Sequence, residues 1–159
     1  MPLDPAHILA LYRAVGDKAR ATGLFQDVID HESDNPPGRA LTCSVIVGPL
    51  EPVGAASGLS IASARLEFTV RMEAPRTAKN PGETDRALLF AGVSVMAGYI
   101  GDFELVGVPD GLVRNVDMFG AHGNGLSFKP GWFPQGEVAY RMADVTVPLI
   151  LNDVFSQGA

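Results

Sequence analysis

The residues whose types could support chemistry are few, and their spacing does not match a known catalytic or metal-binding set. His31, Glu32 and Asp34 lie close together and could hold a cation, but no second histidine is near them. The segment is a proline-rich loop by composition, so solvent-exposed polar side chains are the simpler interpretation. His122 lies among glycines that could cradle an anion, yet no strand-to-helix context follows it. We predict neither a metal site nor a phosphate-binding loop.

The candidate nucleophiles and acids are equally isolated. Cys43 is the only cysteine and lies in a strand-like apolar run, which predicts a buried, inert thiol. Ser57 and Ser60 lack the G-x-S-x-G context of a hydrolase elbow. Asp117 and Asp144 could approach each other across two strands, but any sheet offers such pairs. The sequence therefore contains no recognisable enzyme motif.

Composition limits the class of protein. The chain has 159 residues, of which 47% are hydrophobic and 19% charged, so we predict one compact domain over residues 1–159. The net charge of −6 argues against a nucleic-acid footprint, which needs clustered positive charge. The start of the chain does not predict a signal peptide, and the longest apolar segment is shorter than the ~20 residues that span a bilayer. We expect no sequence-specific nucleic acid and no membrane as partners.

One strand followed by one apolar helix organises the chain. Large apolar residues alternate with polar ones over Arg65–Glu73, which predicts a strand with one face on a core and one face in water. Ala74-Pro75 ends it. Glu83–Arg86 then begins a helix, and from Ala87 to Ile100 the only polar residue apart from glycine is Ser94.

The remaining segments complete an α+β domain. A proline after an N-cap carboxylate predicts a helix from Asp4 to about Gly23. We expect a mostly antiparallel twisted sheet with two main helices on one face. The other expected segments are a short strand or extended lead-in (Leu24–His31), a strand (Ala40–Val47), a loop (Glu51–Ser60), a short strand (Phe103–Gly107), a strand (Leu112–Phe119), a glycine-rich loop (Gly120–Gly136), and a long strand with a β-bulge near Ala143-Asp144 (Glu137–Ile150).

Two features concern surfaces rather than chemistry. A helix that is apolar nearly all round must be covered on more than one side, here by the N-terminal helix or by another subunit. The predicted loop Gly120–Gly136 places Phe128, Trp132 and Phe133 among glycines and prolines. Such aromatic residues are typical interface anchors, although they could also fold back over the end of the sheet.

These elements resemble the tail terminator proteins of long-tailed bacteriophages. The resemblance is carried by the strand Arg65–Glu73, the helix Thr84–Gly101 and the late strand Asp144–Asp153, and it extends from the N-terminal helix to near Phe155. It implies a small α+β protein that forms a homo-oligomeric ring, expected to be a hexamer. It also implies a non-enzymatic protein without a cofactor.

The resemblance further implies a location and partners. The ring would cap the tail tube, end its elongation and dock the head connector, so the tail tube protein and the connector proteins are the expected partners. The protein would assemble in the host cytoplasm and reside at the tail–neck junction of the virion. The family has no characteristic functional residues that could be matched to positions in this chain.

The candidate interface residues therefore come from the sequence pattern. The charged side of the central strand could meet complementary charges on a neighbouring subunit, and the loop aromatics could contact a subunit or the tail. The candidates are Arg65, Glu67, Arg71, Glu73, Phe128, Trp132 and Phe133.

Two alternatives stay open. One is another neck or head-closure protein. The other is a small-molecule enzyme or binding domain that uses residues 120–136 as a lid. A concave pocket with convergent polar groups would favour that domain, whereas an exposed apolar patch would favour assembly.

Overall fold

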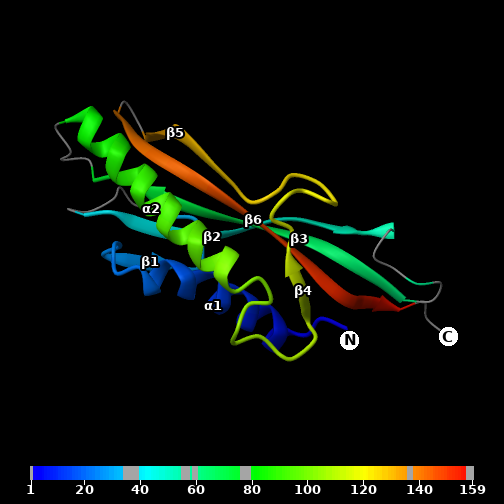
Figure 1. Cartoon of the computed structure of the whole chain (residues 1–159). Helices are drawn as coiled ribbons and strands as arrows, with labels where there is room; N and C mark the ends of the chain where they lie inside the picture. Colours follow the sequence, from blue (N-terminus) through cyan, green and yellow to red (C-terminus); the bar gives the residue numbers. More distant parts are fainter. Residues whose placement is uncertain are drawn as a thin grey trace.

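The computed structural model describes residues 2–33, 40–54, 58, 61–75, 80–135 and 138–156. In chain order its elements are α1 (Pro5–Ala21), β1 (Asp27–Ile29), β2 (Thr42–Pro52), β3 (Ile61–Glu73), α2 (Pro81–Gly101), β4 (Val113–Val116), β5 (Ser127–Gln135) and β6 (Val138–Ser156). Both helices pack on the same face of the sheet (Figure 1). The predicted α+β class is confirmed.

The sheet is built around the long antiparallel pair of β3 and β6. Its order is β1-β2-β3-β6, and the outer edge of β6 is shared by β4 and β5. The β3–β6 pairing runs from Ile61 opposite Ser156 to Glu73 opposite Met142. β5 pairs with the first half of β6 and β4 with the second half, while the β1–β2 pair is parallel. The two central strands therefore present two long faces.

The core lies between the helices and one of these faces. Alternate residues of β3 and β6 point into it and are at most 7% exposed, namely Leu66, Phe68, Val70, Met72, Val145, Val147, Leu149 and Leu151. Leu11 and Val15 of α1 and Leu88 and Val95 of α2 pack against them. Fully burying one such side chain stabilises the fold by roughly 1.5–3 kcal/mol. The Tyr99 hydroxyl joins the two helices by donating to the Val15 carbonyl at 2.7 Å.

Local capping explains where the helices begin. The Asp4 carboxylate accepts from the His7 N–H at 2.8 Å, and Pro5 occupies the first turn, as predicted. Asn80 caps α2 by accepting from the Glu83 N–H at 3.1 Å, so this helix begins earlier than the acidic residues indicated. Neither helix of the described chain is long and apolar enough to cross a membrane.

The predicted loop Gly120–Gly136 is wrong in its second half, where β5 forms. Every residue of β5 pairs with β6, from Ser127 opposite Thr146 to Gln135 opposite Val138. Pro130 and Pro134 obscure the strand in the sequence because proline lacks a backbone N–H. They are tolerated because β5 pairs on one side only and is an edge strand.

The predicted β-bulge near Ala143-Asp144 is also wrong. The register with β3 is continuous through these residues, with Ala143 opposite Met72 and Asp144 opposite Arg71. The apolar phase changes because Tyr140 and Met142 are buried on the sheet face away from the helices. Phe133 covers part of that face, with its ring 5.4 Å from the Tyr140 ring.

The short strand expected as one possibility for Leu24–His31 forms as β1. Other expectations change. Phe103–Gly107 forms turns rather than a strand, and Leu105 and Gly107 have φ values of 55° and 101°. The strand expected to end at Val47 continues as β2, with a register shift between Val47 and Leu50. Thus Glu51 and Pro52, expected in a loop, belong to β2, whereas Asp34, Ser57 and Ser60 lie outside the described residues.

Close packing of α2 on β5 yields a stability prediction. A methyl group at Gly92 would overlap the ring of Phe128, whereas one at Gly101 would meet no atom within 4 Å. Gly92→Ala is expected to lower the free energy of unfolding by about 1–3 kcal/mol because of this overlap. Gly101→Ala, the matched control, is expected to be neutral or slightly stabilising. Urea denaturation measures both, and equal effects would contradict the packing of Phe128 against α2.

Candidate assembly surface

The outer side of α2 is apolar and faces water. Its inner side, which includes Leu88, Val95 and Tyr99, is buried against α1 and the sheet. On the opposite side are four large apolar residues at helical spacing, each more than half exposed: Leu89 (52%), Phe90 (63%), Val93 (58%) and Ile100 (54%). We call these four residues the outer stripe. Packing against α1, one of the two expected covers for this helix, therefore accounts for only part of its apolar surface.

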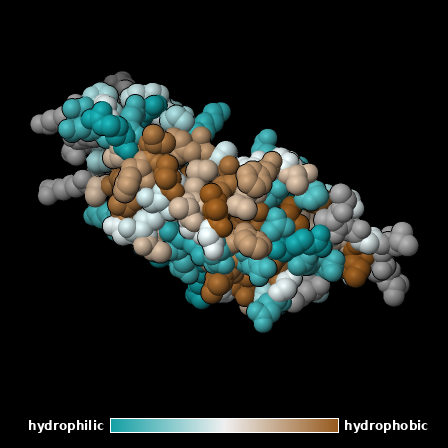
Figure 2. All heavy atoms as spheres, viewed as in Figure 1, coloured by the Kyte–Doolittle hydropathy of each residue, from teal (hydrophilic) through white to brown (hydrophobic). Residues whose placement is uncertain are grey.

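The outer stripe forms part of a visible patch. Figure 2 shows hydrophobic side chains gathered along the surface formed by α2. A phenylalanine side chain alone can bury roughly 150 Å² or more, so the four residues together expose a few hundred Å². Contiguous apolar patches of that size on a protein surface commonly mark an interaction site.

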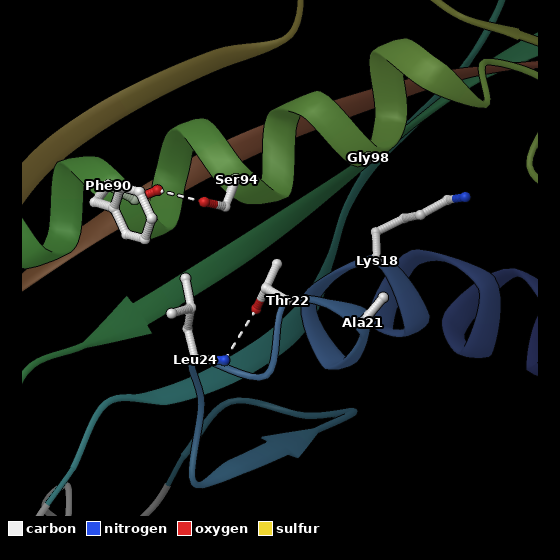
Figure 3. A pocket seen from close by; sticks show the side chains of 7 residues that line it. All are labelled: Lys18, Ala21, Thr22, Leu24, Phe90, Ser94 and Gly98. Atoms are coloured by element: carbon white, nitrogen blue, oxygen red, sulfur yellow. Dashed lines mark hydrogen bonds between the residues drawn. The ribbon is translucent and has the colours of Figure 1, made fainter.

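A groove adjoins the outer stripe between α2 and the end of α1. Its volume is about 460 Å³, and it is lined by Lys18, Ala21, Thr22, Leu24, Phe90, Ser94 and Gly98. Figure 3 shows that Lys18, Ala21, Thr22 and Leu24 line the groove from α1 and the segment after it, whereas Phe90, Ser94 and Gly98 line it from α2. We call this hollow the α1–α2 groove.

The polar atoms of the α1–α2 groove are already engaged within the chain. The Ser94 hydroxyl donates to the Phe90 carbonyl at 2.8 Å, and the Thr22 hydroxyl donates to Ala19 at 2.7 Å. The Lys18 ammonium donates to Asp102 at 2.6 Å, and this hydrogen bond lowers the pKa of the Asp102 carboxyl. The side chains that line the groove therefore offer no converging set of unengaged polar groups for a small molecule.

The three aromatic residues predicted as interface anchors are not gathered in one cluster. Phe128 is half-buried and packs against the core beside Gly92. Trp132 is 60% exposed, with the Arg141 guanidinium 5.0 Å from the centre of its ring. Phe133 lies on the other side of β5, beneath Arg71 at 5.2 Å. Trp132 is the most exposed of the three and the best placed to contact a partner.

The charged side chains of β3 are more buried than the alternating sequence pattern predicted. We call the sheet face opposite the helices, on which Arg65, Glu67, Arg71 and Glu73 lie, the outer sheet face. Arg71 binds the Asp144 carboxylate through two nitrogens, at 2.9 and 3.2 Å, and Glu32 at 3.0 Å. The hydrogen bonds that Arg71 donates to Asp144 raise the pKa of Arg71 further, so this side chain is a fixed cation.

Arg65 and Glu73 are buried, which corrects the prediction of a strand face in water. Arg65 donates to Glu67 at 2.9 Å and to the Asn124 carbonyl, and its Nε lies 3.8 Å from Asp117. These contacts place the loop after β4 over Arg65. Whether any of the four β3 residues contacts another subunit stays a prediction.

Of these four residues, Glu73 has the least complete set of hydrogen bonds. It is 1% exposed, and neither carboxylate oxygen has a hydrogen-bond partner among the described residues. Burial raises the pKa of Glu73 to about 7; the Arg71 cation opposes this rise, and Glu32 and Asp144 add to it. The carboxyl group is therefore largely protonated below neutral pH.

The candidate chemical groups remain scattered. Asp117 accepts from the Ala121 and His122 N–H groups, while Asp144 pairs with Arg71. The Asp117 N–H donates to the carbonyl of Pro148. Pro148 lies four residues from Asp144 along β6, so the backbones of the two acids are separated by roughly 13 Å. Burial raises the pKa of the Cys43 thiol to about 12.

The His31 ring lies beside the exposed Asp30 carboxylate at 3.3 Å. Within the described ranges, no group of three or more His, Cys, Asp or Glu side chains is placed to hold a metal ion.

Sequence reasoning missed two exposed apolar residues. Phe119 is 95% exposed and Val106 is 81% exposed, each in a loop that flanks β4. Phe119 was predicted to end a strand, where one side chain in two is buried. Its exposure depends on the tertiary position of the loop, which no local pattern indicates.

The buried Glu73 carboxyl predicts pH-dependent stability. An unfolded glutamate has a pKa near 4.5, whereas the folded-state pKa is about 7. The unfolded state therefore loses its proton first, and the stability contribution of this group is present below pH 4.5 and lost as the pH rises to about 7. Glu73→Gln is expected to raise the free energy of unfolding at pH 8 by on the order of 1–3 kcal/mol, and to leave it nearly unchanged at pH 4.

Denaturant titrations at the two pH values measure this effect. Glu51→Gln is the control, because Glu51 is exposed on the neighbouring strand. A stabilisation by Glu73→Gln that is equal at both pH values would contradict the assignment.

Comparison with known proteins supports the fold. No protein-family model and no curated protein matches the chain. The chain is similar to a chain of the virion of a native gene transfer agent particle, with a TM-score of 0.57 and 19% identity over 93% of this chain and 98% of that chain. It is also similar to a chain in the sheath/tube terminator structure of an extracellular contractile injection system, with a TM-score of 0.38 and 11% identity over 100% of this chain and 62% of that chain. The first similarity shows a shared fold; the second is too low to carry an argument.

Proposed function

We propose that this chain is a structural protein of a phage-like tail. It forms a homo-oligomeric ring, expected to be a hexamer, that caps the tail tube, ends its elongation and provides the docking surface for the head connector. Its partners are then other copies of itself, the tail tube protein and the connector proteins. It carries out no catalysis and resides at the tail–neck junction of the virion.

The observation that carries the proposal is the exposure of the outer stripe on α2. A chain that remains a monomer would keep four large apolar residues in water, beside a groove with no converging polar groups. A stable interface needs about 800 Å² on each partner, and the stripe supplies a substantial share of that area. The fold shared with a chain of a gene transfer agent virion favours assembly into a tail-like particle.

The alternatives receive less support. An enzyme or binding domain with residues 120–136 as a lid is disfavoured, because most of that segment is strand β5 rather than a loop. Another neck or head-closure protein would use the same exposed surface. A terminator and a neck protein are distinguished by the tail length observed when the chain is absent, because only loss of a terminator gives overlong tails.

The ring proposal predicts a response to charge in the outer stripe. Val93→Glu places a carboxylate at the centre of the stripe, where it must be desolvated in any interface. We expect the purified wild-type chain to form a ring at high concentration and Val93→Glu to remain a monomer, by sedimentation velocity and negative-stain electron microscopy. Both chains should unfold at similar denaturant concentrations, because Val93 is 58% exposed in the monomer.

Val106→Glu is the matched control. Val106 is 81% exposed but lies in the loop between α2 and β4 and is not one of the four residues of the stripe. This variant should assemble as the wild type does. A wild-type chain that stays monomeric at every accessible concentration, or a Val93→Glu variant that forms the ring, would refute the assignment of the outer stripe.

A further inference from the structure

One arginine on the outer sheet face lies among three carboxyl groups. Arg71 of β3 stands directly opposite Asp144 of β6 and donates to it through Nε and Nη2, at 2.9 and 3.2 Å. Its Nη1 donates at 3.0 Å to Glu32, which belongs to the segment after β1. Glu73 lies two residues further along β3 and shares this face, because side chains alternate along a strand. One cation is therefore placed among acids from three segments of the chain.

The three acids differ in how much each would gain from a cation. The Glu32 side chain is 57% exposed and that of Asp144 is 26% exposed, so water solvates both in part. Glu73 is 1% exposed, and neither carboxyl oxygen has a hydrogen-bond partner in the described chain. A carboxylate that is buried without a partner is far less stable than one in water. Once ionised, Glu73 therefore gains most from Arg71, whereas Glu32 loses least when it is released.

The contact with Glu32 is also the one that Arg71 can give up most readily. Asp144 binds two guanidinium nitrogens in a fork, which is the stronger arrangement. Glu32 binds a single nitrogen, and exposed ion pairs of that kind contribute little. The Phe133 ring lies 5.2 Å from the guanidinium carbon and adds a contact that keeps the guanidinium on this face. Nη1 is therefore the donor that a further carboxylate would capture.

The other charged groups nearby are placed to act on Asp144 or Glu32 rather than on Glu73. Lys129 of β5 stands directly opposite Asp144. His31 precedes Glu32 and lies beside the exposed Asp30 carboxylate. The neighbours of Glu73 on β2 and β6 are uncharged near neutral pH, namely Thr42, Cys43, Tyr140 and Met142.

The protonation of Glu73 changes near neutral pH. Burial raises the pKa of Glu73 to about 7; Arg71 opposes this rise, and Glu32 and Asp144 add to it. Below neutral pH the carboxyl group is protonated, and Arg71 stays with Asp144 and Glu32. Above neutral pH the buried carboxylate attracts Nη1. Because capture of Nη1 stabilises the anion, the change has its midpoint at or below a pH of about 7.

We propose that Arg71 exchanges partners as the pH rises through neutrality: it keeps Asp144, binds the ionised Glu73 and releases Glu32. The segment after β1 then loses this contact with the outer sheet face. The exchange goes beyond the proposed function, because it requires neither a ring nor a tail.

A nitroxide spin label at position 31 tests the exchange. His31→Cys places the label beside Glu32, at a side chain that is 65% exposed, and removes a histidine that titrates in the same pH range. The native Cys43 stays unlabelled because its thiol is buried. The mobility of the label, measured by electron paramagnetic resonance, should rise between pH 5.5 and pH 8.5, with a midpoint at or below about 7.

Three further substitutions in the labelled chain assign the cause. Glu73→Gln should abolish the rise, so that the label stays as immobile at pH 8.5 as at pH 5.5. Glu32→Gln should leave the label mobile at both pH values; Glu32 is exposed, so this variant tests the contact without disturbing the core. Glu51→Gln removes an exposed acid from the neighbouring strand and should leave the rise unchanged. Circular dichroism confirms that each variant is folded.

Three results would overturn the exchange. They are a label mobility that does not change with pH in the labelled chain, the same rise in Glu73→Gln, and a label that remains immobile at pH 5.5 in Glu32→Gln. The label reports on a contact within one chain, so any of these results leaves the ring proposal standing. Failure of the ring proposal likewise leaves the exchange standing.

Discussion

The burial of one side of α2 against α1 and the sheet is the interaction on which the rest of the structure depends. It brings Leu88, Val95 and Tyr99 into one core with β3 and β6, and the Tyr99–Val15 hydrogen bond fixes the two helices together. Because a two-layer domain has only one layer of helices, none of the described segments covers the other side of α2. The same packing that completes the core therefore leaves the outer stripe exposed.

The outer sheet face is stabilised by a different kind of contact. Near β5, Phe133 and Tyr140 pack together and Arg71 binds Asp144, while near β4 the loop over Arg65 closes the surface. Buried pairs of this kind contribute little net stability, but they hold backbone segments in one position. The result is a two-layer domain with exposed apolar residues on the helix layer and ion-paired charged residues on the opposite sheet face. Two unlike faces suit the repeated head-to-tail contact of a ring.

Local signals in the sequence predicted the parts of the fold that local physics determines. The cap at Asp4, the alternation of β3 and the apolar phase of the second half of β6 each depend on neighbouring residues, and each was confirmed. The strand β5 was missed because Pro130 and Pro134 interrupt its pattern, and an edge position is known only once the sheet is assembled.

The candidate site depends still more on tertiary structure. Trp132 is exposed and stays a predicted contact, but Phe128 packs against the core, and Arg65 and Glu73 are buried under segments far away in the sequence. The apolar character of α2 was visible in the sequence, yet which side stays exposed follows from the placement of α1. Phe119 was missed for the same reason: its exposure results from the Asp117 and Arg65 contacts, which join residues up to 59 positions apart.

The most direct test of the central claim is electron microscopy of the particles produced when this gene is deleted from the phage or phage-like element that encodes it. If the chain caps the tail tube, the deletion should give tails of uncontrolled, excessive length that lack heads, and expression of the chain in trans should restore normal particles. Filled heads beside tails of normal length would contradict a role in ending tail growth and indicate a joining protein instead. Normal, functional particles would contradict the structural role altogether.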